Sequence, residues 1–536
     1  MRFITAIIAI LLVITGCNKG PRLTEKSIAS QALHVGNGQE PQELDPHIIT
    51  GITEIKILSA LFEGLTGQDP NDLSPTPAAA ESWKVSEDGT SYTFNLRKNS
   101  TWNNEEQLIA GDFEYAFQRI LTPRVAAPNA YLLFVIKNAK DFHNGSIGWE
   151  KVGVNTIDDN TLNIELENPT PYFLKLLSHP AWFPLHKESL SKLGDPFGRA
   201  SGWTHSEDFI SNGPFNLSAW KVNEYVHVSR NEMYWDNSIS QLNEIFFYPT
   251  ESREAEERSF RAGQLHVTEA VPVSKVGVFR KNNNSSLHID PYLGTYYLQL
   301  NTRKPPLSDP RVRKALSLAI NRSMIVDQIT QGRQQPAWHF TPPGTGGYDP
   351  GISAERNIAQ AKNLLSDAGF PEGNGFPELT YLYNTSENNK AIAVALQQMW
   401  KASLGIHVEI INQELKVVNQ SRETGEFDLL KSSWIGDYDD ASSFLDVWTS
   451  DSGNNFTGWS STRYDSFLEK SRTSSSTDNR FNYFKAAEEL LIEEQPILPL
   501  YFYTSVYLKH PAVKGYHPTL LNYHPWKHVY LEVQDK

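Results

Sequence analysis

The sequence predicts a multi-domain α/β protein, and three observations support this prediction. Its 536 residues correspond to about two to four domains of about 150 residues each. Hydrophobic residues make up 39% and charged residues 21% of the chain, which is a globular composition. Segments with strand-like alternation are interspersed with segments of helical periodicity, and this mixture indicates neither an all-α nor an all-β fold.

Two segments alternate as strands. Residues 91–96 place Tyr92, Phe94 and Leu96 on one face, and an Asp-Gly turn signal precedes them at 88–89. Residues 161–166 alternate in the same way through leucine and isoleucine. Each segment therefore predicts a half-buried strand.

Two segments have helical signals. Residues 309–325 begin with Asp309, which can cap a helix, and Pro310, which suits the first helical position. An apolar stripe follows at helical spacing. Residues 391–400 predict a second helix, and the strand 407–410 follows it.

The formal charge of −14 and the absence of Lys/Arg blocks exclude the usual electrostatic footprint of a nucleic-acid-binding protein. The same absence argues against a basic patch that would lie on a membrane surface. The charge mainly favours solubility.

The N-terminus predicts export. Arg2 is followed by a run at 3–14 that is apolar except for Thr5, too short to span a bilayer but typical of a signal peptide. The run ends in Ile-Thr-Gly-Cys at 14–17, which resembles a bacterial lipobox. The alternative is an ordinary signal peptide that happens to contain a cysteine. Cys17 is the only cysteine, so no internal disulfide can form. We expect residues 1–16 to be removed, Cys17 to carry lipid, and the polar residues 17–31 to act as a tether.

The common motifs of enzymes are missing from the sequence. It has no Gly-x-Ser-x-Gly elbow, no His-Glu-x-x-His, no phosphate-binding loop and no cysteine pair. The carboxylates at 437–440 lack the glycine and the distal glutamate of a calcium loop. We therefore predict no catalytic residues, no metal site and no cofactor.

Several blocks resemble the extracellular solute-binding proteins for peptides, in particular their oligopeptide branch. The longest is Ala-Glu-Ser-Trp-Lys-Val-Ser-Glu-Asp-Gly at 80–89. The other blocks, in chain order, are 40–46, 61–65, 94–97, 211–215, 309–316, 342–348 and 434–445. The resemblance covers about residue 32 to the end of the chain.

The resemblance implies a periplasmic binding protein-like α/β fold with two lobes and an extra small domain, hinged around a buried ligand cleft. Domain I would be discontinuous and combine residues 32–62, 187–288 and 505–536. Domain II would be 63–186, and domain III would be 289–504.

The resemblance also implies how a peptide is held. The ligand's backbone would pair as an added strand with Thr50-Gly51-Ile52 on one side and Ser433-Trp434-Ile435 on the other. Asp437 would bind the free ammonium group, because an unpaired charge in a closed cleft is costly. Taken alone, Asp437 could equally initiate a turn.

The carboxyl end of the ligand is where the sequence departs from the family. Relatives have an arginine and a histidine at positions that read Lys431 and Asn389 here. Lysine keeps the charge and loses the bidentate fork, so carboxylate recognition is looser, shifted, or carried by Arg422, which matches a family arginine. Tyr131 and Tyr296 match aromatic residues that face the cleft in the family, although either could be a core residue.

The predicted function is therefore the binding component of an ABC-type oligopeptide importer, a monomer that lies outside the cytoplasm on a lipid anchor. Its partners would be short peptides, the permease subunits in the membrane and, indirectly, their ATPases. A binder of murein-derived peptides, signalling peptides or another solute is the first alternative. An exported peptidase and a surface chaperone are the other two.

Overall fold

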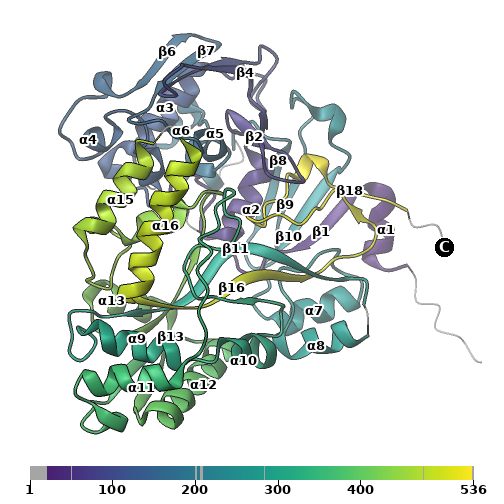
Figure 1. Cartoon of the computed structure of the whole chain (residues 1–536). Coiled ribbons are helices and arrows are strands. Elements are labelled where there is room, and N and C mark those ends of the chain that lie inside the picture. The colour runs from purple at the N-terminus through teal and green to yellow at the C-terminus, as the bar shows by residue number, and fades with distance from the viewer. Residues whose placement is uncertain are drawn as a thin grey trace, which may run out of the picture.

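The computed structural model describes residues 21–49, 51–199, 202–205, 209–282, 284–474 and 476–533, and Figure 1 shows their arrangement. The fold is a mixed α/β fold, as the sequence predicts. Cys17 and Thr50 lie outside the described residues. The predicted division into three domains stays a prediction, and domains I, II and III name the residue sets given above.

Domain I contains a four-stranded sheet in the order β1-β10-β9-β8. Parallel pairing of β1 with β10 brings segments more than 200 residues apart side by side. The strands are β1 (Ala32–Gly36), β8 (Phe215–Lys221), β9 (Tyr225–Arg230), β10 (Glu244–Tyr248) and the short pair β17 (Val513–Lys514) and β18 (Tyr530–Leu531). The helices are α1 (Leu23–Ser30), α2 (Ile52–Leu61), α6 (Lys187–Leu193), α7 (Arg253–Arg261) and α8 (Val273–Lys281).

Domain II contains the antiparallel sheet β4-β5-β7-β6. Its predicted strands are confirmed, with β5 at Ser91–Leu96 and β7 at Thr161–Glu165. The others are β2 (Thr66–Gln68), β3 (Pro75–Pro77), β4 (Ala80–Val85) and β6 (Val154–Asp158). The helices are α3 (Ala110–Leu121), α4 (Ala139–His143), α5 (Phe173–Leu176) and the short 3₁₀ turn η2 (Ala130–Leu133).

Domain III is built on a six-stranded sheet in the order β12-β16-β11-β15-β13-β14. The strands are β11 (Leu287–Leu300), β12 (Gln335–Pro336), β13 (Leu379–Asn384), β14 (Val408–Gln413), β15 (Leu429–Ile435) and β16 (Ile497–Leu508). The helices are α9 (Pro310–Ala319), α10 (Arg322–Met324), α11 (Ile358–Asp367), α12 (Glu387–Leu404), α13 (Leu415–Thr424), α14 (Ser442–Leu445), α15 (Thr462–Arg472) and α16 (Thr477–Glu494).

The predicted helix over 309–325 is shorter than expected. Asp309 caps it by accepting from the Arg311 amide at 2.9 Å, and Pro310 takes its first position, as predicted. The helix stops because Ile320 is extended and the Asn321 side chain accepts from the Met324 amide at 3.0 Å, which starts a new helix. The predicted helix 391–400 is α12, which Ser386 caps.

The predicted tether over 17–31 is wrong for its described part. Residues Leu23–Ser30 form α1, whose first turn is closed by a hydrogen bond from the Arg22 amide to Glu25 Oε2 at 3.0 Å. The Thr24 amide donates to the Gly263 carbonyl at 3.0 Å, and Ser27 Oγ lies 2.9 Å from His34 Nε2. These contacts hold α1 on domain I.

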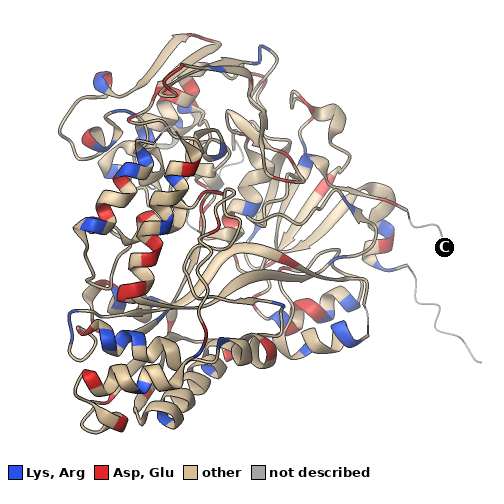
Figure 2. Cartoon of the chain, in the orientation of Figure 1, with Lys and Arg blue, Asp and Glu red and all other residues tan. Residues whose placement is uncertain are grey.

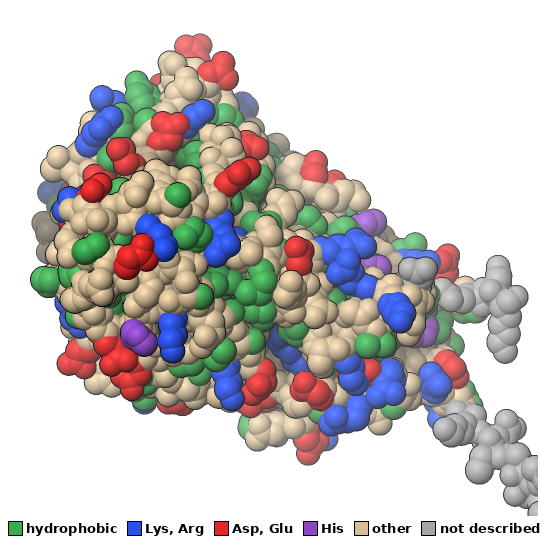
Figure 3. Space-filling view, turned by 60° about the horizontal axis from the view of Figure 1, so that its bottom comes forward, with side chains coloured by type: hydrophobic (Ala, Val, Ile, Leu, Met, Phe, Trp, Pro, Cys, Tyr) green, Lys and Arg blue, Asp and Glu red, His purple; other side chains and the backbone are tan. Residues whose placement is uncertain are grey.

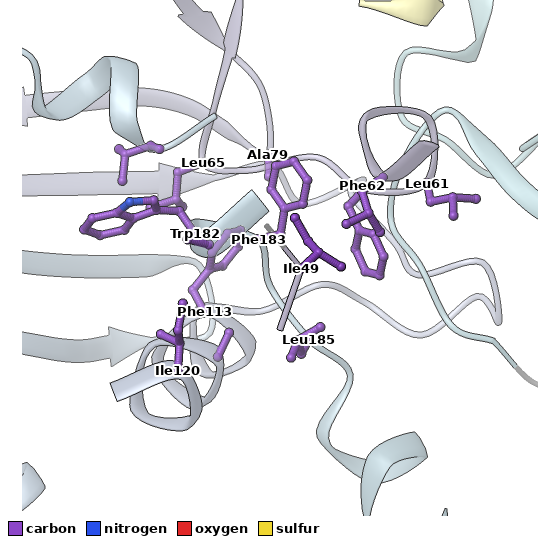
Figure 4. Packing of buried hydrophobic residues seen from close by; sticks show 14 of the residues in the cluster. Ile49, Leu61, Phe62, Leu65, Ala79, Phe113, Ile120, Trp182, Phe183 and Leu185 are labelled. Carbon is purple, nitrogen blue, oxygen red and sulfur yellow. The ribbon is translucent and has the colours of Figure 1, made fainter. Parts of the chain in front are cut away.

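Domains I and II share one hydrophobic core, whereas the main clusters of domain III are separate. Figure 4 shows Ile49 and Phe62 from domain I packed around Phe183 from domain II. The rings of Phe62 and Phe183 are stacked with centroids 6.0 Å apart. The molecule therefore has two lobes, one made of domains I and II and the other of domain III.

Strands β11 and β16 connect the lobes. His288 pairs with Tyr507 and Asp290 pairs with Ser505, so both predicted crossings, at 288–289 and 504–505, fall in this strand pair. A register shift follows between Pro291 and Thr295. We therefore expect the lobes to rotate about each other at this irregularity in the paired strands.

A buried ion pair joins domain I to domain II. Arg119 of α3 donates to Asp45 Oδ2 at 2.6 Å and to Oδ1 at 3.0 Å, and both side chains are nearly inaccessible to solvent. Burial alone would raise the pKa of Asp45, but the Arg119 charge and hydrogen bonds bring that pKa below its ordinary value. Trp203 Nε1 donates to the same carboxylate at 3.2 Å.

We predict that Asp45→Asn will lower the free energy of unfolding by roughly 3–5 kcal/mol, because it leaves the Arg119 charge buried without its partner. Urea unfolding followed by tryptophan fluorescence measures the change. Glu165→Gln is the matched control, since the Lys137–Glu165 pair is about half exposed and its loss should cost less than about 1 kcal/mol. Equal effects of the two substitutions would contradict the prediction.

Candidate functional site

Strand β15 presents an edge that its own sheet does not use fully. Its residues 429–435 pair with β11, but β13 pairs only with Leu429 and Leu430. Side chains alternate along a strand, so Lys431, Ser433 and Ile435 share one face and Trp434 lies on the other. Ser433 is exposed, and Lys431 and Ile435 are half-buried. The described ladder thus leaves Lys431–Ile435 without a neighbour on the β13 side.

Asp437 follows directly on this face. Its amide donates to Ser443 Oγ at 2.9 Å, and its Oδ2 accepts from the Tyr131 hydroxyl at 2.7 Å. Burial raises the pKa of Asp437 to about 6, and the Tyr131 hydrogen bond offsets only part of that shift. No cation within the described ranges forms an ion pair with Asp437. A neutral hydroxyl therefore leaves most of the cost of a buried carboxylate uncompensated.

Two cations lie at the other end of the same face. Burial, and to a lesser extent the positive charge of Arg422 on α13, lower the pKa of Lys431 to about 8. The buried Nε of Arg422 has no hydrogen-bond partner in the described part of the chain, although the guanidinium lies 4.8 Å over the Phe456 ring. Two neighbouring cations with an unused buried donor form a site for an anion.

The family resemblance places Asn389 and Tyr296 at the cleft, but both side chains are buried in the structure. Tyr296 is 1% exposed, its ring stacks on Tyr501 at 4.9 Å, and its hydroxyl donates to Asn389 Oδ1 at 3.1 Å. The Asn389 amide nitrogen donates to Asn384 at 3.0 Å, so the protein itself engages both ends of that side chain. Tyr296 packs against the site, because Lys431 Nζ lies 5.2 Å from the centroid of its ring. Asn389 in turn accepts from the Tyr296 hydroxyl and fixes that ring.

The first predicted pairing segment is only partly extended. Gly51 has extended backbone angles, but helix α2 begins at Ile52, so Ile52 does not have strand geometry. Ile52 instead lines a cavity of about 300 Å³ together with Trp434 and Asp437. A second cavity of about 360 Å³ also contains Trp434 and Asp437 in its wall. The Trp434 indole is fixed by a hydrogen bond to the Ser443 carbonyl at 2.7 Å.

Residues Asp437-Tyr438-Asp439-Asp440, termed here the tetrad, join the two lobes. Tyr438 stacks on Tyr172 of domain II with ring centroids 4.6 Å apart. Asp439 accepts from Lys175 of domain II at 2.7 Å, and Asp440 pairs with Arg480 of domain III at 2.7 Å. With the Tyr131 contact, the tetrad makes three contacts to domain II. The lobes are therefore closed on each other at this position.

Sequence reasoning missed Tyr172 and Lys175. Their partners lie more than 260 residues away in the chain, and neither residue has a local pattern that distinguishes it from other exposed positions. In the sequence, the cluster of carboxylates at 437–440 was the signal for this contact between the lobes. In the part of the chain that the structure describes, no group of three or more His, Cys, Asp or Glu side chains is placed to hold a metal ion.

Comparison with known proteins identifies the family. A family model described as "Bacterial extracellular solute-binding proteins, family 5 Middle" matches residues 74–456. The chain belongs to this family. It is 37% identical over 485 residues to the periplasmic murein peptide-binding protein MppA of Escherichia coli, covering 89% of this chain and 88% of the relative. It is 35% identical to the periplasmic oligopeptide-binding protein OppA of the same organism, covering 93% and 91%.

Solved structures of relatives share the fold. The Escherichia coli murein tripeptide-binding protein MppA aligns with a TM-score of 0.83 at 36% identity over 93% of this chain and 98% of that one. Haemophilus influenzae OppA in complex with the peptide RPPGFSPFR aligns with a TM-score of 0.82 at 31% identity, covering 94% and 99%. The unliganded open form of MppA aligns less well, with a TM-score of 0.75 at 36% identity, covering 94% and 97%.

We predict that Asp437 titrates near pH 6 in the peptide-free protein and that Tyr131→Phe raises this value, because the lost hydrogen bond stabilises the carboxylate. Infrared difference spectra between each protein and its Asp437→Asn counterpart isolate the carboxyl band. A carboxylate returned to water titrates near 3.8, so protonation should favour the closed, empty form as the pH falls through about 6. A transition near pH 4 in the wild type would contradict the prediction.

Proposed function

We propose that this chain is the substrate-binding component of an ABC-type oligopeptide importer, which captures short peptides and delivers them to a membrane permease. One observation carries the proposal. An uncompensated carboxylate, Asp437, lies at one end of the β15 face, and an uncompensated cation pair, Lys431 of β15 and Arg422 of the adjacent α13, lies at the other. A zwitterionic peptide has the opposite charges at its two ends.

The spacing of the charges favours short ligands. Six residue steps separate Lys431 from Asp437, and at about 3.3 Å per step they span roughly 20 Å. An ion-pair contact at each end takes up about 3 Å. An extended peptide of about three to five residues fills the remainder.

The free edge of β15 supports recognition of the peptide backbone. Strand addition satisfies the amide groups of any peptide, so it does not depend on the ligand's sequence. Ser433 is small and leaves the edge accessible. Side chains of the ligand would alternate toward the cleft walls, where water can adapt to each of them.

The proposed mechanism is closure of the two lobes around the ligand. The tetrad contacts to Tyr131, Tyr172 and Lys175 exist only while the lobes are together. Better superposition on one MppA structure than on its unliganded open form is consistent with a closed state in this chain. Closure would also give the permease a shape to recognise.

A binder of murein-derived peptides is the second candidate, and the 37% identity to a murein peptide-binding protein favours it. Signalling peptides or another solute remain part of the same alternative. Native mass spectrometry of ligand that co-purifies from cells separates these ligand classes. An exported peptidase is another alternative, and incubation with peptide separates it from a binder, because an enzyme would return cleaved peptide.

The proposed location is outside the cytoplasm, with the protein as a monomer held by lipid on Cys17. The Ile-Thr-Gly-Cys motif at 14–17 supports the anchor. None of the helices in the described ranges is long and apolar enough to cross a membrane. Several acyl chains on one cysteine would hold the protein firmly without such a helix.

We expect Asp437 to pair with the ligand's ammonium group. Breaking a buried ion pair from one side costs roughly 3–5 kcal/mol, which is about a hundred-fold to several-thousand-fold in affinity. Acetylating the peptide's amino terminus should therefore weaken binding to the wild type strongly and to Asp437→Asn far less. Calorimetry on the four protein–peptide pairs gives the coupling energy.

A peptide amidated at its carboxyl end is the matched control, because it loses a charge at the opposite end of the ligand. Amidation should change the affinity by the same factor in the wild type and in Asp437→Asn, since distant sites act additively. Equal loss on acetylation in the wild type and in Asp437→Asn would assign the ammonium group to another acidic residue.

Replacement of Cys17 by serine should release the protein from membranes or leave an unprocessed precursor, because serine cannot accept a thioether-linked lipid. Detergent phase partitioning and the mass of the N-terminal peptide measure the two outcomes. Cys17 is the only cysteine, so no other thiol can substitute. A processed serine variant that still partitions into detergent would refute the lipid anchor.

A further inference from the structure

A third hollow lies away from the tetrad, where α8 of domain I meets Ile289 and Arg333 of domain III. It has a volume of about 650 Å³ and runs beside the end of α8. Its apolar floor includes Phe279, Leu287 and Ile289, and its cations are Arg280, Lys281 and Arg333. We call it the α8 groove. None of its lining residues is acidic.

The charge of the α8 groove is opposite to that of the whole chain, which has a formal charge of −14. Arg280, Lys281 and Arg333 are exposed, and none of them forms an ion pair within the described ranges. Arg280 Nη1 donates only to the Gln331 carbonyl, at 3.1 Å. Val278, on the same helix, is 58% exposed. The groove thus combines free cations with accessible apolar surface.

The neighbouring helix extends this basic surface. Lys275 of α8 and Arg261 of α7 share the buried carboxylate of Glu257, so two cations are matched by one anion. Arg258 is exposed one turn before Arg261. Figures 2 and 3 show Lys and Arg side chains gathered on the side of the molecule that carries α7 and α8. The fold assembles this patch from separate segments, which is why the sequence, lacking Lys/Arg blocks, argued against one.

The groove lies close to the N-terminal end of the described chain. Ser286, next to the groove residues, accepts from the Lys509 amide at 2.9 Å, and Lys509 pairs with Val267. Two strand spacings of about 4.8 Å therefore separate Ser286 from Val267. The adjacent His266 Nε2 lies 3.2 Å from the carbonyl of Thr24 in α1. A short series of backbone contacts thus joins the groove to α1.

The anchor proposed above restricts where this face can be. Four peptide units separate residue 17 from residue 21, where the described chain begins, and they span at most about 14 Å when fully extended. A lipid on Cys17 would therefore keep residue 21, two residues before α1, within about 14 Å of the bilayer surface. Such a short link also gives the nearby groove a high effective concentration of lipid headgroups.

We propose that the α8 groove binds the anionic phospholipid headgroups of the membrane that holds the protein, with Val278 entering the interface. The proposal rests on the lipid anchor for its biological setting, but the groove's affinity for lipid is a property of the fold alone. Basic residues near an anionic bilayer attract it within a Debye length, and a neighbouring apolar side chain adds to binding. Domain I would then lie against the bilayer in one orientation.

The test uses the unlipidated chain from residue 18 onward, which keeps every described residue. Vesicle co-sedimentation at low ionic strength compares phosphatidylcholine with phosphatidylcholine containing phosphatidylglycerol. Each basic residue at an anionic surface contributes about a five-fold factor. The triple variant Arg280→Gln, Lys281→Gln, Arg333→Gln should therefore bind the anionic vesicles about 100-fold more weakly than wild type.

The matched control neutralises three exposed lysines elsewhere, Lys84→Gln and Lys98→Gln in domain II and Lys485→Gln on α16, and it should bind like the wild type. Val278→Asp should also weaken binding, and unchanged peptide affinity in all variants verifies that each one is folded. Equal loss in the control and the triple variant would overturn the proposal, because it would indicate bulk charge. Absence of vesicle binding by the wild type would overturn it too, and would point to an acidic segment of a protein partner.

The vesicle result does not depend on the peptide or the lipid anchor. If peptides do not bind, the proposed function fails, and if Cys17 carries no lipid, the proposed anchor fails; in either case the groove still distinguishes the two kinds of vesicle. If the groove fails this test, the calorimetric evidence on Asp437 is unaffected. The two proposals can therefore be refuted separately.

Discussion

Asp437 is a half-buried carboxylate that lacks an ion-pair partner, whereas its acidic neighbours each have one. Within the tetrad, Asp439 has Lys175 and Asp440 has Arg480, whereas Asp437 has only the neutral Tyr131 hydroxyl. A raised pKa of about 6 is the physical sign of that imbalance. The cost is tolerated because β15 is fixed in the middle of a six-stranded sheet and Ser443 holds the Asp437 backbone. An ammonium group from outside would remove the imbalance without any rearrangement.

Near the other end of β15, two positive charges also lack a partner of opposite charge. Burial and the Arg422 charge lower the pKa of Lys431, and the Arg422 Nε has no partner among the described residues. The side chains that pack against these two cations carry no charge, since Lys431 lies over the Tyr296 ring and Arg422 lies over the Phe456 ring. Specificity for a zwitterion thus comes from two unsatisfied charges held about 20 Å apart. The free backbone edge of β15 between them pairs with the amide groups of the peptide, so this pairing does not depend on the ligand's side chains.

Local patterns predicted local structure well and distant contacts poorly. The alternation of Tyr92 and Phe94 determined β5, and Asp309 with Pro310 determined the start of α9, because these signals act over a few residues. The polar segment before residue 31 was misread, since α1 depends on a partner at Gly263. Within the site, Asp437 came from the family motif. Asn389 and Tyr296 are buried, which the sequence could not decide because only packing determines whether a side chain faces the core or the cleft.

The two proposals are linked by the position of domain I. Domains I and II share one core, so we expect them to move as one body, while β11 and β16 are the paired strands that cross to domain III. If the α8 groove, with Arg280 and Lys281 from domain I and Arg333 from the part of domain III next to the crossing, rests on the bilayer, the far part of domain III is what moves when a peptide enters. Its displacement relative to the membrane would then differ between the empty and loaded states. A permease in the same membrane could distinguish those states from the position of domain III, without contacting the peptide before delivery.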